Sequence, residues 1–166
     1  MQPVRIGVLS DTHLSKLTPA FEQLVDLCFS SVSMIFHAGD LTDPHILKAF
    51  KNKKVHAVHG NMCSTGSLQA LPRKKTVTVG KFTIGLIHNT GYAYNFEDQL
   101  SLEFDEVDCI IYGHTHTPTC HKSGGILYLN PGSFQTTGRF GAPGTFAILE
   151  ADTELKATLY EVPALR

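Results

Sequence analysis

Short apolar runs that end in metal-ligating residue types constrain the fold of this chain more than any other feature. The runs are a few residues long, which predicts buried strands. Seven candidate ligands follow them, in the order Asp11, His13, Asp40, Asn61, His88, His114 and His116. In open α/β sheets, binding sites form in the crevice beyond the carboxyl ends of the strands. The pattern therefore predicts one site at the strand ends, with too many ligands for a single cation.

The first third of the chain alternates strand and helix patterns. Apolar runs at Val4–Ser10, Met34–Ala38 and Val55–Val58 predict three strands. Between them, Thr18-Pro19 and Asp43-Pro44 each place a capping residue before a proline, which is typical of a helix start. This βαβαβ order predicts parallel strands joined by right-handed crossovers.

The remainder of the chain favours antiparallel pairs. Three hairpins are predicted: Thr76–Val79 with Phe82–Ile87, Thr119–Lys122 with Ile126–Leu129, and Thr145–Glu150 with Lys156–Glu161. A short helix around Phe96–Phe104 and a buried strand at Cys109–Tyr112 are expected between them. We therefore predict an α/β fold with two mixed β-sheets packed face to face and flanking helices, a four-layer α/β/β/α sandwich. Residues 1–166 are expected to form a single domain.

Composition and charge argue against several classes of protein. The formal net charge of −1 gives no electrostatic signature of a general nucleic-acid surface or of membrane binding. No apolar stretch approaches the roughly 20 residues that span a bilayer. The four cysteines lack paired spacing, and Met1–Arg5 shows no leader pattern. We therefore predict a cytoplasmic protein without a membrane partner.

The spacing of the candidate ligands suits metal coordination. Asp11 and His13 are two residues apart, as are His114 and His116, so both members of each pair can face one point. Asp40 is a carboxylate that could bridge two cations about 3.5–4 Å apart. Imidazole and oxygen ligands without thiolate suit Mn, Fe, Co, Ni or Zn, and the residue types leave the choice among these metals open.

The ordered set resembles the calcineurin-like metallophosphoesterase superfamily, and the chain is most similar to its small bacterial and archaeal phosphodiesterases. The Asn130–Ser133 loop is part of that resemblance. The resemblance implies that one metal is held by Asp11, His13, Asp40 and His116. It implies a second metal held by Asp40, Asn61, His88 and His114, with Asp40 shared. The implied cofactors are two divalent ions, with Mn favoured, and the implied reaction is attack of a metal-bridging hydroxide on the phosphorus of a small phosphodiester.

Candidate catalytic residues are Asp40, His59 and His114. His59 lies two residues before the ligand Asn61 and could reach a substrate phosphate or donate a proton. Further candidates for substrate contact, His121 and Arg139, are more simply explained as surface residues. His37 is equally consistent with a hydrogen-bonded support of the site and with simple burial.

Two positions depart from the family pattern. Many superfamily phosphatases carry a histidine that assists the leaving group after the ligand asparagine, followed by an acidic residue. This chain has Met62 and Cys63 there, and Asn89-Thr90 after His88. A general acid typically contributes about 10²–10⁴-fold to the rate, so its absence affects poor leaving groups most. We therefore predict a preference for activated or aryl diesters over alkyl monoesters.

Two other functions stay open. One is a non-catalytic interaction scaffold resembling the retromer subunit of this fold; such scaffolds lose key ligands, whereas this chain retains all seven. The other is a nucleotide or cyclic-nucleotide hydrolase, for which no cluster of base-stacking aromatic residues is evident. Assembly into a homo-oligomer is also left open.

Overall fold

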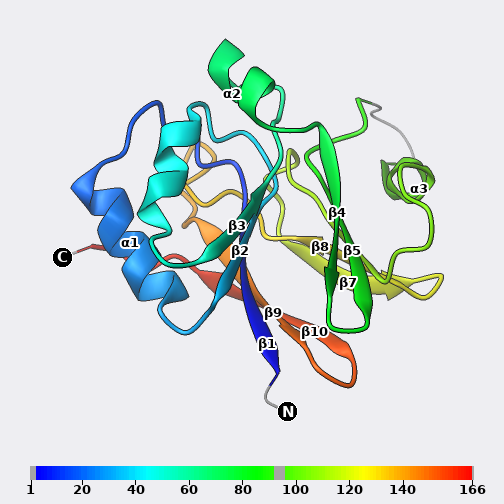
Figure 1. Ribbon diagram of the computed structural model, residues 1–166. Coiled ribbons are helices and arrows are strands. Elements are labelled where there is room, and N and C mark those ends of the chain that lie inside the picture. The colour runs from blue at the N-terminus through cyan, green and yellow to red at the C-terminus, as the bar shows by residue number, and fades with distance from the viewer. Residues whose placement is uncertain (1–2, 92–95, 166) are drawn as a thin grey trace.

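Two mixed β-sheets form the centre of the structure, a computed structural model that describes residues 3–91 and 96–165 (Figure 1). The first sheet contains β1 (Val4–Leu9), β2 (Met34–His37), β3 (Lys54–Ala57), β9 (Thr145–Ala151) and β10 (Leu155–Glu161), in the order β10-β9-β1-β2-β3. The second contains β4 (Lys74–Val79), β5 (Phe82–Ile87), β6 (Cys109–Ile111), β7 (Thr119–Ser123) and β8 (Ile126–Asn130), in the order β4-β5-β6-β8-β7. Met1 and Gln2, part of the segment in which no leader was predicted, lie outside the described residues.

Each sheet combines parallel and antiparallel pairs. Strands β1, β2 and β3 are parallel, as the βαβαβ pattern predicts, and β5, β6 and β8 are parallel in the second sheet. The pairs β4–β5, β7–β8 and β9–β10 are antiparallel, which confirms the three predicted hairpins. The carboxyl ends of the parallel strands therefore lie at one edge of each sheet.

The main core fills the space between the sheets. Alternate residues of the first sheet, such as Val8 and Phe36, face alternate residues of the second, such as Leu86 and Ile111. All four side chains have no measurable exposure. Burial of these apolar surfaces on both sides stabilises the face-to-face packing at about 25 cal/mol per Å².

Helices cover the outer faces of both sheets (Figure 1). The helix α1 (Pro19–Phe29) and the 3₁₀ helix η1 (Pro44–Ala49) pack on the first sheet, and α3 (Phe96–Leu102) packs on the second. The predicted four-layer sandwich is confirmed. That the chain forms a single domain stays a prediction.

Two helical segments differ from the sequence-based expectation. The segment after Asp43 is a 3₁₀ helix, in which Ile46 N–H donates to Asp43 C=O and Phe50 N–H donates to Leu47 C=O. A further short helix, α2 (Thr65–Ala70), was not predicted, because its sequence offers only one strongly apolar side chain and no helical periodicity. Its Ser64 cap, which accepts a hydrogen bond from Ser67 N–H, was the available signal.

No helix within residues 3–91 and 96–165 combines the length and apolar character needed to cross a membrane.

Candidate metal centre

The loops that follow five parallel strands carry the seven predicted ligands. Asp11 and His13 follow β1, Asp40 follows β2, Asn61 follows β3, His88 follows β5, and His114 and His116 follow β6. Because parallel strands end at the same edge of a sheet, and the two sheets pack face to face, these loops converge. The structure brings all seven side chains into one connected group.

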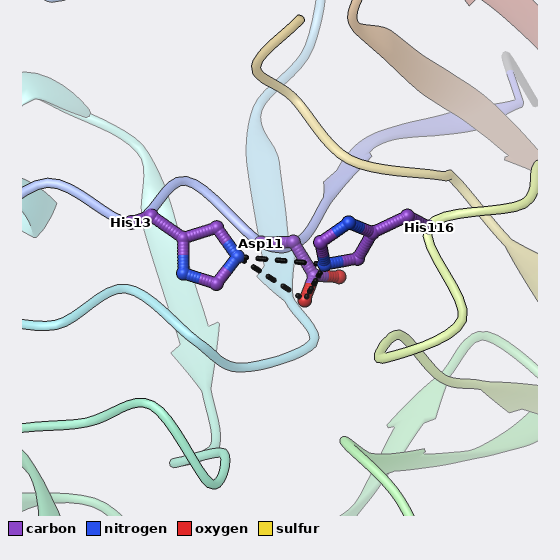
Figure 2. A group of neighbouring side chains, drawn as sticks. All are labelled: Asp11, His13 and His116. Carbon is purple, nitrogen blue, oxygen red and sulfur yellow. Dashed lines mark hydrogen bonds and ion pairs between the residues drawn. The ribbon is translucent and has the colours of Figure 1, made fainter. Parts of the chain in front are cut away.

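The first part of this group contains Asp11, His13 and His116 (Figure 2). Asp11 Oδ1 lies 3.1 Å from His116 Nε2 and 3.7 Å from His13 Nε2. The two imidazole Nε2 atoms lie 3.5 Å apart. Figure 2 shows the three side chains pointing toward one another from the loops after β1 and β6. Two ring nitrogens and one carboxylate oxygen that face a common point form a donor set suited to one cation.

The second part contains Asp11, Asp40 and His88. His88 Nε2 lies 3.2 Å from Asp40 Oδ2 and 3.9 Å from Asp11 Oδ1. His88 Nδ1 lies 2.7 Å from the Ala38 carbonyl oxygen, which only accepts hydrogen bonds. The Nδ1–H must therefore donate to Ala38, and Nε2 is the nitrogen that faces the carboxylates and could bind a cation once deprotonated. Asp11 belongs to both groups of ligands.

Asn61 connects His114 to the second group. Its Oδ1 lies 3.1 Å from His88 Nε2 and 3.0 Å from His114 Nδ1. Asn89 donates its Nδ2–H to the same oxygen at 3.3 Å. This contact orients the amide so that its oxygen, and not its nitrogen, faces the two imidazoles.

Hydrogen bonds fix the orientation of both carboxylates. Asp11 Oδ2 accepts hydrogen bonds from the Ser10 hydroxyl at 2.6 Å and from His114 N–H at 3.2 Å. Asp40 Oδ1 accepts a hydrogen bond from Met62 N–H at 2.6 Å. In each residue one oxygen is held by the surrounding loops, and the other is presented to the histidines.

The electrostatics of the site favour the ionised form of Asp40. Burial alone would raise the pKa of Asp40, but the hydrogen bonds from His88 and Met62 N–H more than offset it, so the pKa lies below its ordinary value. Burial alone would lower the pKa of His88, yet its contact with Asp40 and the charge of Asp11 hold that pKa above its ordinary value. His88 therefore gains a proton readily when only carboxylates face it, and a cation bound there would displace that proton.

Five of the ligands have left-handed backbone conformations. Their φ angles are 53° at Asp11, 47° at His13, 55° at Asp40, 71° at His114 and 57° at His116. Residues other than glycine adopt this region at a cost of roughly 1–3 kcal/mol each, and such residues cluster at functional sites. The strain is evidence, independent of residue type, that these loops are shaped for a site.

Glycines precede three ligands because the chains approach closely there. A Cβ added to Gly60 would collide with Asp40 Oδ1, and one added to Gly39 would lie 2.7 Å from the His88 side chain. At Gly113 it would lie 2.9 Å from Asp11 Oδ2. A side chain at any of these positions would displace a ligand.

Three buried polar residues support the ligand loops. Gly39 N–H donates to His37 Nδ1 at 3.2 Å, so His37 Nε2–H donates to Thr12 Oγ1 at 3.1 Å, between two ligands. Burial lowers the pKa of His37 to about 3, so the ring is neutral at ordinary pH. Asn130 donates to Gly113 C=O at 3.1 Å, and the Ser133 hydroxyl donates to the Asp11 C=O at 3.1 Å. His37 is thus hydrogen-bonded beside the site, and the Asn130–Ser133 loop holds the ligand loops in place.

His59 lies beside the ligands and not among them. It lines a cavity of about 270 Å³ together with Gly60, Asn61, Leu68, Arg73, His88 and Asn89. This position is compatible with contact to a substrate. Its catalytic role stays a prediction.

His121 and Arg139 lie elsewhere. His121 stacks on Tyr128, and its Nε2 lies 2.6 Å from Glu97 Oε1. Arg139 lies over the ring of Phe140. Within the described ranges, the structure joins neither side chain to the ligand group.

Comparison with known proteins places the chain among phosphoesterases. A family model described as the calcineurin-like phosphoesterase superfamily domain matches residues 4–154. A probable metallophosphoesterase of Methanocaldococcus jannaschii is 42% identical over 133 residues, which cover 77% of this chain and 67% of the relative. A phosphodiesterase of the same archaeon is 26% identical over 165 residues, covering 92% and 95% of the two chains.

Solved structures share the fold. A predicted phosphoesterase from Streptococcus pneumoniae has a TM-score of 0.75 at 25% identity, covering 97% of this chain and 91% of that one. Vacuolar Protein Sorting 29 from Cryptosporidium parvum has a TM-score of 0.72 at 19% identity, covering 97% and 98%. At that identity, the second similarity concerns the fold alone.

Proposed function

Because this chain belongs to the calcineurin-like phosphoesterase superfamily, we propose that it is a dinuclear metal-dependent phosphodiesterase. One observation carries the proposal: oxygen and nitrogen donors from the loops after five strands converge at one edge of the two sheets. Five of the seven residues that supply these donors have left-handed backbone conformations. The similarity to a relative named phosphodiesterase supports the choice of diesters. A cytoplasmic location and a small phosphodiester substrate are part of the same proposal.

The donor set fits two divalent cations. Asp11, His13 and His116 would hold one ion, and Asp40, His88, Asn61 and His114 would hold the other. The proximity of Asp11 Oδ1 to His88 makes Asp11 a second carboxylate within reach of both ions, alongside the shared Asp40 that the family resemblance implies. When bound, the two ions would supply a nucleophilic water of lowered pKa and would neutralise charge on the phosphate. The native metal, with Mn favoured, is left to experiment.

The residues around the ligands limit which leaving groups depart. Met62 occupies the position of the assisting histidine and is 60% exposed, and its thioether cannot donate a proton. Cys63 Sγ accepts a hydrogen bond from Gly60 N–H at 3.1 Å, which assigns it to the turn that carries Asn61. We therefore expect leaving groups that need no protonation, such as aryl alcohols, to react fastest.

The proposal is tested by metal content and hydrolysis measured on the same preparations. Wild-type protein should bind two ions per chain and hydrolyse a chromogenic aryl diester with Mn²⁺ or Ni²⁺, faster than an alkyl monoester. Asp40→Ala should lose both properties, whereas Asp26→Ala, which removes an exposed carboxylate on α1, should keep them. Comparable rates on aryl diesters and alkyl monoesters would contradict the predicted preference.

The rival function is a metal-binding interaction scaffold. The fold similarity to Vacuolar Protein Sorting 29 motivates it, and the full ligand set argues against it. Wild-type protein that binds two ions but hydrolyses neither diesters nor monoesters would favour the scaffold. A screen that includes cyclic nucleotides tests the nucleotide hydrolase in the same experiment.

A further inference from the structure

The cavity beside the ligands is placed to receive one part of a phosphodiester. Its wall includes the ligands Asn61 and His88, so it opens directly on the position where a phosphate would be bound. A diester extends from its phosphorus in two directions. One of its two ester groups can therefore lie in this cavity while the phosphate faces the ligands.

The cavity wall carries a cation that is only partly neutralised. Arg73 donates to both oxygens of Glu103, at 2.8 and 2.6 Å, and Lys74 Nζ lies 3.1 Å from the same carboxylate. Two cations share one carboxylate, so the three residues carry a net charge of +1. The Arg73 side chain is 48% exposed, and a guanidinium has five N–H donors. Arg73 can therefore bind a second anion without releasing Glu103.

The remaining wall residues limit the size and polarity of the bound group. Leu68 of α2 is 48% exposed and offers an apolar surface, while Asn89 and His59 offer polar side chains. The volume of about 270 Å³ is smaller than the roughly 300–1,000 Å³ typical of drug-sized ligands. A short carbon chain that ends in an anionic group matches these walls.

We propose that this cavity binds one ester group of the substrate and that Arg73 favours groups carrying a second anionic charge, a carboxylate or a phosphate. The inference rests on the proposed phosphodiesterase function and names its substrate class. Arg73 is a specificity-determining residue in this account, because it contacts the ester group and not the reacting phosphorus.

A matched pair of substrates measures this preference. The pair consists of p-nitrophenyl butyl phosphate and p-nitrophenyl 3-carboxypropyl phosphate, which differ by the terminal carboxylate. Wild-type protein should have a kcat/KM about tenfold higher on the carboxylated ester, the scale of one charge-assisted hydrogen bond. Arg73→Gln should lower the ratio of kcat/KM on the carboxylated ester to kcat/KM on the butyl ester from about ten to about one.

Two further variants control for net charge and for folding. Lys81→Gln removes the same charge from the turn between β4 and β5, outside the cavity, and should leave the preference intact. Glu103→Gln frees Arg73 and should increase the preference. A preference that survives in Arg73→Gln, or one that Lys81→Gln removes equally, overturns the inference.

A binding measurement separates this inference from the proposed activity. Calorimetry on the metal-loaded protein compares butyl phosphate with 3-carboxypropyl phosphate, and 3-phosphopropyl phosphate distinguishes a phosphate from a carboxylate as the second anion. Tighter binding of the two ligands that carry a second anionic group, if it depends on Arg73, supports the inference even if no diester is hydrolysed. Equal affinities in wild type overturn it even if hydrolysis is fast.

Discussion

Two buried histidines of this molecule lie in opposite surroundings. His88, at the end of β5, faces the carboxylates of Asp11 and Asp40, and its pKa lies above the ordinary value. His56, in the middle of β3, packs edge-on against Phe36 between the sheets, and burial lowers its pKa to about 4. Neither ring nitrogen of His56 has a hydrogen-bond partner among the described residues.

The comparison shows that burial alone does not decide the direction in which the pKa of a histidine shifts. Both side chains are at least nine-tenths buried, with 2% exposure at His88 and 8% at His56. His88 lies among polar loops at a strand end, whereas His56 lies within a strand, against the ring of Phe36 and with Lys75 and Lys54 as its nearby charges. At the strand end, burial beside carboxylates makes His88 a candidate cation ligand. In the middle of the strand, burial leaves the ring nitrogens of His56 without partners among the described residues, which is destabilising.

Removing His88 should have the largest effect. His88→Ala deletes the imidazole that lies between Asp11 and Asp40, and we expect metal affinity to fall at least about 100-fold, because even residues that only orient ligands contribute 10–100-fold. Calorimetric titration with Mn²⁺ measures this. His56→Leu should keep wild-type affinity, and a comparable loss in both variants would erase the contrast between the two histidines.

The pH dependence of stability tests His56. Its folded pKa is below the unfolded value of 6.5, so the unfolded chain binds the proton more readily and stability falls as the pH drops from about 6.5 toward 4. We expect a loss of about 2 kcal/mol between pH 7 and pH 5 that is absent in His56→Leu. Urea unfolding of metal-free protein at both pH values measures the difference. His37 contributes a loss of the same sign to both proteins, and it cancels in the comparison.

Glycine substitutions test the close packing at the strand ends. Gly60→Ala places a methyl group against Asp40 and His88, and we expect destabilisation of about 1–3 kcal/mol together with weaker metal binding. Gly66→Ala in α2 meets only Ser64 Oγ at 3.6 Å and should stabilise by about 0.5–1 kcal/mol. Thermal unfolding of the two variants should therefore shift in opposite directions, and equal shifts would contradict the steric account.

The smallest effect is expected at Cys63. Cys63→Ala removes the acceptor of the Gly60 N–H, and we expect a loss of about 1 kcal/mol with a modest decrease in metal affinity. Cys120→Ala on β7, where the thiol is exposed, should change neither quantity. A full loss of metal binding in Cys63→Ala would instead indicate that the thiol is a ligand.

The sequence predicted what depends on short-range pattern and chain order. Apolar runs define the strands, and the order of strands and crossovers places the residues that follow β1, β2 and β3 at one edge of their sheet. Strand order alone therefore predicted that Asp11, Asp40 and Asn61 lie close together. The candidate ligands of the second sheet were expected at the same site because they also follow apolar runs.

Other features depend on contacts that no local pattern encodes. The proximity of Asp11 to both His116 and His88 arises from the way the two sheets meet. Arg73 and Glu103 are thirty residues apart, and their pairing places a cation on the cavity wall. The 3₁₀ form of η1 depends on hydrogen bonds between residues three apart, which the capping signal at Asp43 does not distinguish from an α-helix.

The left-handed ligands have a consequence for how this protein could change. Glycine and asparagine adopt the φ angles of His13 and His116 at lower free energy than histidine does. A substitution such as His116→Gly would therefore remove a metal ligand and relax its loop in one step. Keeping histidine at these two positions therefore costs the folded chain free energy, and the proposed metal site is the property that this cost would serve.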